Sequence, residues 1–178
     1  MLEQNLFAGF GGQGMLLIGQ FLAYAGMIED KYVSWLPSYG PEMRGGTANC
    51  SVILSEDPVG SPIITEPDVL IAMNLPSLQK YVNAVVPGGQ IYLDSTLIAE
   101  KVDRTDVDVF YIPATQMAKD EGISSLANMI IIGHLLQNNS ELSFDGTEAV
   151  VQKLVPPTKA ALVELNMKAL LLGKEYSA

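Results

Sequence analysis

The sequence predicts a single α/β domain: a Rossmann-like three-layer sandwich with a mainly parallel sheet and helices on both faces. Short β-branched and aromatic runs alternate with helical segments along the chain, and this alternation is typical of a parallel sheet between helical layers. The 178 residues, 48% of them hydrophobic, suffice for one substantial core. Because no linker, repeat or low-complexity segment interrupts the chain, residues 1–178 form one predicted domain.

The elements follow from periodicity and turn residues. An apolar strand is expected at 2–10, and a helix at 15–28 follows a glycine-rich turn. β-branched and aromatic residues predict the further strands, which are expected at 31–36, 47–55, 67–74, 90–97 and 107–115. Apolar residues at helical spacing predict the further helices, which are expected at 75–85, 115–122, 124–138, 145–154 and 156–173.

The first predicted helix lacks a polar face. Gln20 is its only strongly polar side chain, whereas a helix at the surface normally presents polar residues on one side. We therefore expect it to be covered on both sides, and in a chain of this size a partner subunit is the favoured cover.

Composition limits the function classes. The formal net charge of -10 argues against binding a nucleic acid backbone. One cysteine, Cys50, and one histidine, His134, cannot assemble a soft-ligand metal site, so any metal or cluster is expected in another chain. No apolar run reaches the roughly 18 residues of a membrane span, and Glu3 stands where a signal peptide is basic. The expected location is the cytoplasm, without a membrane span.

Gly9, Gly11 and Gly14 satisfy the GxGxxG pattern between a strand and a helix. The pattern alone is weak evidence, because any tight strand-to-helix crossing favours glycine. No acidic residue ends the second predicted strand, where a ribose-binding carboxylate would be expected, and no lysine follows Gly14 as in a P-loop. Both NAD binding and nucleotide triphosphate hydrolysis are therefore disfavoured.

A second concentrated signal is the segment 34–52, "SWLPSYGPEMRGGTANCSV". Its prolines and glycines predict a defined loop that displays Tyr39, Glu42, Met43 and Arg44, and loops of this kind commonly carry function. The alternative is that Arg44 pairs with Glu42 or another carboxylate and the loop is only a connection.

The histidine and the cysteine are reactive residue types, but structural roles explain both of them more simply than catalytic roles do. His134 lies on an apolar helical segment, where a lone histidine is more often a hydrogen-bonded core residue than a catalyst. Cys50 alternates with Val52 and Leu54 along a strand, which is typical of a small core residue. We nominate neither as a site residue.

The segments "GFGGQGM", "PSYGPEMRGG", "DVLIAMN", "VPGGQIYLDS" and "IPATQMAKDEG", in this order, resemble the gamma subunit or gamma domain of 2-oxoacid:ferredoxin (acceptor) oxidoreductases. The resemblance covers almost the whole chain and is most specific where GGQG and SYGPEMRGG occur together. The small subunit of indolepyruvate oxidoreductase shares the domain.

The resemblance implies a complex that decarboxylates a 2-oxoacid on thiamine diphosphate, transfers electrons through iron–sulfur clusters to ferredoxin or a similar acceptor, and forms an acyl-coenzyme A. Thiamine diphosphate would lie between the alpha and beta subunits. The iron–sulfur clusters would be bound by cysteine-rich regions elsewhere in the complex, such as a ferredoxin-like delta subunit. This chain would bind no cofactor tightly, would support assembly and coenzyme A access, and would be inactive alone. The favoured substrate is 2-oxoglutarate, giving succinyl-coenzyme A, with pyruvate and branched-chain 2-oxoacids close behind. Two alternatives stay open: a pyruvate or indolepyruvate oxidoreductase subunit, and an independent Rossmann-type nucleotide-binding oxidoreductase.

The resemblance also assigns site residues, none of them catalytic or metal-binding. Helix amides after the glycine turn can meet a phosphate or a partner's carboxylate, and Arg44 suits either anion through paired hydrogen bonds. The candidate coenzyme A or interface contacts are Gly11, Gly12, Gln13, Gly14, Tyr39, Glu42, Arg44, Gly45 and Gly46.

Overall fold

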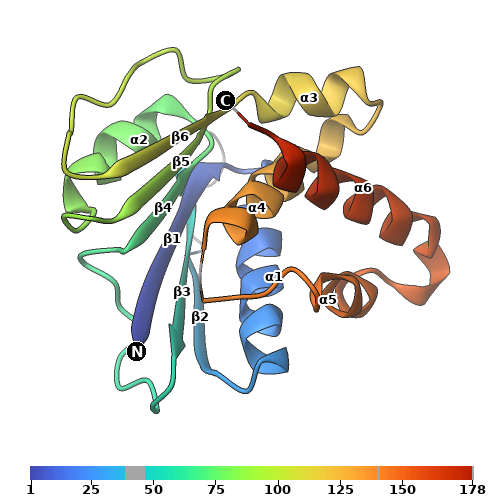
Figure 1. Cartoon of the computed structure of the whole chain (residues 1–178), viewed down its shortest axis with the longest axis horizontal. Helices are drawn as coiled ribbons and strands as arrows, with labels where there is room; N and C mark the ends of the chain where they lie inside the picture. Colours follow the sequence, from blue (N-terminus) through green and yellow to red (C-terminus); the bar gives the residue numbers. More distant parts are fainter. Residues whose placement is uncertain (39–46, 140, 178) are drawn as a thin grey trace.

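A computed structural model describes residues 1–38, 47–139 and 141–177 of the chain. Its framework is a six-stranded sheet in the order β2-β3-β1-β4-β5-β6 (Figure 1). The strands are β1 (Leu2–Phe10), β2 (Tyr32–Ser38), β3 (Thr47–Ser55), β4 (Val69–Ala72), β5 (Gln90–Asp94) and β6 (Asp108–Ile112). Each coincides closely with a strand that the sequence predicts.

Strand β3 alone runs against the rest of the sheet. It pairs antiparallel with both β1 and β2, whereas β1, β4, β5 and β6 are joined by parallel pairs. The expectation of a mainly parallel sheet is confirmed. Because Phe10 lies opposite Thr47 and Ser38 lies opposite Asn49, the chain leaves β2 and enters β3 at the edge where β1 ends.

Helices cover both faces of the sheet, as predicted. The helices are α1 (Met15–Ile28), α2 (Leu75–Tyr81), α3 (Ala114–Asp120), α4 (Ala127–Asn138), α5 (Thr147–Leu154) and α6 (Ala161–Glu175). Figure 1 shows α2 on one side of the sheet and α1, α4, α5 and α6 on the other. Across the described parts of the chain, no helix combines the length and the apolar character needed to cross a membrane.

The chain itself supplies the cover that the apolar α1 requires. Residues Ile18, Phe21 and Leu22 are fully buried, and α1 contacts β2, β3, α4 and α5. A side chain on Gly26 would meet the Leu54 Cδ2 atom at 2.6 Å, so glycine lets α1 lie close to β3. The expected partner subunit is therefore not needed to explain this helix, although Leu17 in its first turn stays 36% exposed.

Helix α4 is the most enclosed helix of the described chain, since every residue from 127 to 136 is buried. Helix α6 completes this burial through a crossing in which the two backbones touch. A Cβ atom on Gly133 would meet the Leu170 carbonyl oxygen, and a Cβ atom on Gly173 would meet the Ile130 carbonyl oxygen. Glycine at both positions therefore sets how closely the helices approach.

Replacing Gly173 with alanine should separate α4 from α6, because the new methyl group has no space beside the Ile130 carbonyl. We expect the free energy of unfolding to fall by about 3 kcal/mol, as in other overpacked interiors. Urea denaturation measures this change. Gly60→Ala is the matched control, because its Cβ would have nothing within 4 Å. Equal stabilities of the two variants would contradict the close helix crossing.

Candidate functional site

The glycine turn lies where the sheet topology favours ligand binding. After β1 the chain continues into α1 on one face, and after β4 it continues into α2 on the other (Figure 1). The carboxyl ends of adjacent parallel strands whose connections diverge in this way are the usual binding position in open α/β sheets. We call this position between β1 and β4 the crevice. Gly11 and Gly12 are exposed at this position.

The turn leaves the beginning of α1 uncapped. Gly12 and Gly14 have φ angles of 91° and 77°, in the left-handed region that favours glycine. Gly14 is the N-cap residue and provides no side-chain hydrogen bond, and the first turn of α1 contains no acidic residue. The first amides of an α-helix have no acceptor within the helix, so this end of α1 can receive an anionic oxygen.

Gln13 holds the turn against the neighbouring strand. Its Oε1 atom accepts a hydrogen bond from the Phe10 amide at 2.6 Å, and its Nε2 atom donates to the Met73 carbonyl oxygen at 2.9 Å. The side chain thus links the residue that ends β1 to the residue that follows β4. Gln13 was predicted as a contact to a ligand or partner, and the described structure gives it a role in shaping the crevice.

Three buried side chains around the crevice have polar atoms without a partner among the described residues: Asn74 Nδ2, Ser77 Oγ and Asn128 Oδ1. Asn74 follows β4, and its Oδ1 accepts from the Ser77 amide at 2.8 Å. Asn128, on α4, donates from Nδ2 to the Gly14 carbonyl oxygen at 3.2 Å. Unsatisfied buried polar groups are costly and rare, so these three atoms are candidates for a further hydrogen bond at this end of the sheet.

Sequence reasoning did not select these three residues. An asparagine after the buried run "DVLIAM" and one at the start of an apolar helix are weak signals of a position that requires a polar group. Whether such a group is already hydrogen-bonded depends on three-dimensional contacts that no single segment encodes.

The predicted residues Tyr39, Glu42, Arg44, Gly45 and Gly46 lie outside the described residues. The described residues on either side, Ser38 and Thr47, lie at the same sheet edge as Phe10. The structure therefore brings the ends of this segment to the glycine turn, and the roles of its residues stay predictions.

Asp94, at the carboxyl end of β5, is fully engaged within the chain. Its Oδ2 atom accepts from the Thr115 hydroxyl at 2.6 Å and from the Thr115 amide at 3.1 Å, and its Oδ1 atom accepts from the Thr96 amide at 3.0 Å. It anchors α3 to β5 and is not a candidate ligand contact.

The core assignments of His134 and Cys50 are confirmed. Tyr92, Phe110 and Tyr176 surround the His134 ring, whose Nδ1 lies 3.1 Å from the Gly173 carbonyl oxygen. Burial lowers the pKa of His134. Burial also favours the neutral form of Cys50 and raises the pKa of its thiol to about 11, although Trp35 donates a hydrogen bond to the sulfur at 2.9 Å. Neither group is poised for acid–base or redox chemistry.

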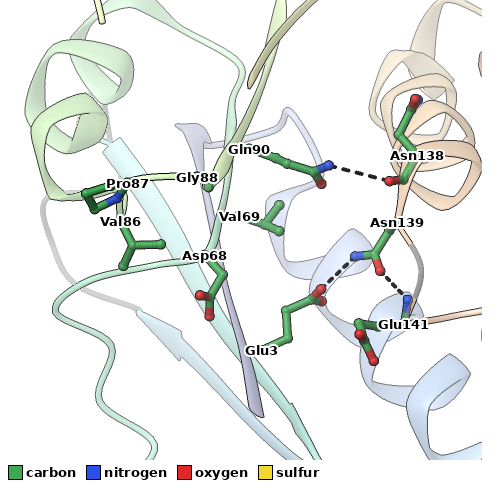
Figure 2. A pocket seen from close by; sticks show the side chains of 11 residues that line it. Glu3, Asp68, Val69, Val86, Pro87, Gly88, Gln90, Asn138, Asn139 and Glu141 are labelled. Carbon is green, nitrogen blue, oxygen red and sulfur yellow. Dashed lines mark hydrogen bonds between the residues drawn. The ribbon is translucent and has the colours of Figure 1, made fainter. Parts of the chain in front are cut away.

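A hollow of about 280 Å³ lies at the other end of the strands, away from the glycine turn (Figure 2). Its buried Glu3 carboxylate accepts hydrogen bonds from Asn5 Nδ2 and Asn139 Nδ2, each at 2.9 Å. Asn139 Oδ1 in turn accepts from the Glu141 amide at 2.6 Å. Within residues 1–38, 47–139 and 141–177, no group of histidine, cysteine and carboxylate ligands is arranged to hold a metal ion. The Glu3 bonds instead connect β1 to the end of α4.

The fold and the crevice define a Rossmann-like α/β domain that presents uncapped helix amides beside unsatisfied polar groups. Residues 4–176 match the family described as pyruvate ferredoxin/flavodoxin oxidoreductase. The chain belongs to this family.

Individual relatives include both long and short proteins. Ketoisovalerate oxidoreductase subunit VorA of Methanothermobacter thermautotrophicus is 38% identical over 174 residues, which cover 96% of this chain and 35% of VorA. The chain thus spans about a third of that relative. 2-Oxoglutarate synthase subunit KorC of Methanothermobacter marburgensis is 33% identical over 182 residues, covering 98% of this chain and 96% of KorC.

Solved structures agree with the fold. The gamma subunit of keto/oxoacid ferredoxin oxidoreductase from Geobacter sulfurreducens superposes with a TM-score of 0.86 at 32% identity, covering 98% of this chain and 95% of that one. A chain of 2-oxoglutarate:ferredoxin oxidoreductase from Magnetococcus marinus has a TM-score of 0.88 at 23% identity, covering 97% of this chain and 30% of that one. At this lower identity the second match shows the fold alone.

Replacing Gln13 with alanine removes both hydrogen bonds that connect the glycine turn to Met73. We expect a loss of about 2 kcal/mol in unfolding free energy, near 1 kcal/mol for each bond. Chemical denaturation measures it. Gln152→Ala is the control, because the side chain of that exposed glutamine donates to Glu148, one turn earlier in the same helix. Similar stabilities of both variants would rule out the linking role of Gln13.

The buried Glu3 should make stability depend on pH. Burial raises its pKa above the ordinary 4.5, and the bonds from Asn5 and Asn139 oppose that shift only partly. As the pH rises from 4.5 through the raised pKa, the unfolded chain ionises Glu3 more readily than the folded chain. The wild type should therefore lose stability relative to Glu3→Gln over this interval. Thermal melts of both proteins at several pH values test this, and a stability difference that stays constant with pH would count against it.

Proposed function

We propose that this chain is the gamma subunit of a 2-oxoacid:ferredoxin oxidoreductase that oxidatively decarboxylates a 2-oxoacid in the presence of coenzyme A. The observation that carries the proposal is the uncapped glycine turn at the crevice between β1 and β4. Similarity to oxidoreductase gamma subunits along nearly their whole length supports it.

The glycine turn is proposed to contact coenzyme A when the complex is assembled. Phosphate oxygens suit the free amides of α1, and Asn74 Nδ2 and Ser77 Oγ are unpartnered groups that can donate hydrogen bonds nearby. Arg44, on the segment joined to the same edge, adds a positive charge for a phosphate. The Magnetococcus marinus structure is described with 2-oxoglutarate, coenzyme A and succinyl-CoA bound, which supports this ligand class.

The proposed division of labour leaves the redox chemistry to partner subunits. Alpha and beta subunits are proposed to hold thiamine diphosphate. A ferredoxin-like delta subunit is proposed to hold iron–sulfur clusters that pass the electrons to the acceptor ferredoxin. With one cysteine, this chain has too few thiolates to ligate a cluster alone. Its role is to complete the complex and to position coenzyme A, and it is inactive by itself.

We further propose 2-oxoglutarate as the substrate and succinyl-coenzyme A as the product. The match to KorC over 96% of that protein supports this choice, while the match to VorA supports ketoisovalerate. The substrate carboxylates would meet residues of the partner subunits. An assay of the native complex with 2-oxoglutarate, pyruvate, ketoisovalerate and indolepyruvate decides among them, and preference for another acid overturns the choice.

Assembly is tested by co-purification of the tagged chain from its native cell. Thiamine-diphosphate and iron–sulfur subunits should accompany it, and their absence would reject the gamma-subunit proposal. Isothermal titration of the isolated chain with NAD, NADP and FAD tests the competing independent enzyme. Tight binding of any of the three would favour that alternative.

Replacing Arg44 with alanine should raise the KM for coenzyme A about tenfold, which corresponds to the loss of one charge-assisted contact of about 1.4 kcal/mol. Assembly should be unchanged, because no apolar volume is lost. Steady-state kinetics of the assembled complex measure the effect. Lys80→Ala removes an exposed positive charge from α2 and serves as the control. Unchanged coenzyme A kinetics in the Arg44 variant would remove this residue from the site.

A further inference from the structure

A large apolar hollow opens beside the first turn of α1. It has a volume of about 610 Å³ and lies between the beginnings of α1, α4 and α6 and the end of α5. We call it the aliphatic groove. The side chains used below to characterise it are Leu17, Leu126, Met129, Leu154, Leu162 and Leu165.

The groove leaves aliphatic side chains in contact with solvent. Leu17 is 36% exposed, Leu162 37% and Leu165 39%, and none of the groove's lining residues is charged. Large apolar patches are uncommon on monomeric proteins and commonly mark an interface. The lack of charge indicates an occupant that is itself apolar, because a charged group would lose its hydration here without gaining an ion pair.

The position of the groove connects it to the proposed coenzyme A site. Leu17 lies three residues after Gly14, the N-cap of α1, so one wall of the groove begins at the glycine turn. Met129 lies next to Asn128, which hydrogen-bonds to Gly14. If coenzyme A binds at this turn and accepts its acyl group there, the partner subunit that delivers the acyl group borders the same side of the molecule.

Two relatives of different length indicate what occupies the groove. This domain forms 35% of VorA, so that relative joins it covalently to a much longer chain, whereas the match to KorC covers 96% of a protein of similar size to this chain. A domain on a separate chain needs a noncovalent surface to keep its neighbour in place. Buried aliphatic area is the main source of that stabilisation.

We propose that the aliphatic groove docks an uncharged, leucine-rich or otherwise aliphatic segment of a partner subunit of the oxidoreductase. The inference rests on the proposed function and identifies the surface through which that function is assembled. Helices α4, α5 and α6 border the groove, and this arrangement suits a helix whose apolar face packs between them.

The same helix offers a matched control. Leu171 on α6 is 42% exposed but lies in a different hollow, with Glu164, Lys168 and Glu175. A charge introduced at Leu171 therefore changes the surface of α6 to a similar extent without entering the aliphatic groove.

The test uses the full chain together with its co-expressed partner subunits. The double variant Leu162→Asp/Leu165→Asp should weaken association roughly tenfold or more, because two charges would be buried at an apolar interface, whereas Leu171→Asp should stay near the wild-type affinity. Biolayer interferometry gives the dissociation constants, and circular dichroism confirms folding. Hydrogen exchange of the wild type gives a second measurement, in which 122–129 and 151–166 should gain protection in the complex.

Three outcomes would overturn the inference. The double variant binding the partners as tightly as the wild type, or Leu171→Asp weakening binding equally, would place the interface elsewhere. A dimer of the isolated wild-type chain that the double variant dissociates would identify a second copy as the occupant. Failure of the wild type to bind any partner would instead reject the proposed function, so the two failures are distinguishable.

Discussion

The backbone contact between α4 and α6 determines how the helical side of this domain is arranged. Gly133 and Gly173 each face a carbonyl group of the other helix, so neither helix can move closer and neither tolerates a side chain there. This approach encloses α4 from 127 to 136. It also fixes the first turn of α4, where Asn128 donates to the Gly14 carbonyl oxygen. A packing constraint on the far side of α4 therefore helps to hold the glycine turn.

The glycines of the turn itself have different physical causes. A side chain on Gly9 would meet the Met73 Cβ atom at 3.0 Å, so this glycine permits close approach of β1 to the end of β4. Gly14 combines a positive φ with contact to Asn128, whereas Gly12 needs its positive φ but faces open space. Packing and backbone conformation therefore account for Gly9 and Gly14 of the GxGxxG pattern without a dinucleotide. The case for a ligand rests on the uncapped α1 and the unpartnered atoms beside it.

The sequence allowed the elements to be predicted because their local signals agree with their environment. The apolar run at 15–28 became a helix, and the β-branched run at 47–55 became a strand. The antiparallel direction of β3 was not predicted, since alternation of strands and helices does not encode direction. The short stretch of sequence between residues 38 and 47 was the usable signal, because a parallel pair needs a crossover of roughly a dozen residues or more. The covering of α1 by its own chain was also missed, because it depends on contacts distant in sequence.

The two edges of the sheet differ in how completely their polar groups are satisfied. At the amino edge, Glu3 accepts from Asn5 and Asn139 and so closes the end of α4 onto β1. At the carboxyl edge, Asp94 is satisfied by Thr96 and Thr115.

Four buried side-chain atoms lack partners among the described residues: Asn5 Oδ1, beside Glu3, and Asn74 Nδ2, Ser77 Oγ and Asn128 Oδ1, toward the edge where β1 and β4 end. The carboxylates at the two edges are thus satisfied by the chain itself, whereas three of the four unpartnered atoms lie where a ligand or subunit is proposed to bind. Such a separation lets a ligand or subunit be gained at the crevice while the hydrogen bonds that hold the sheet and its helices together stay unchanged.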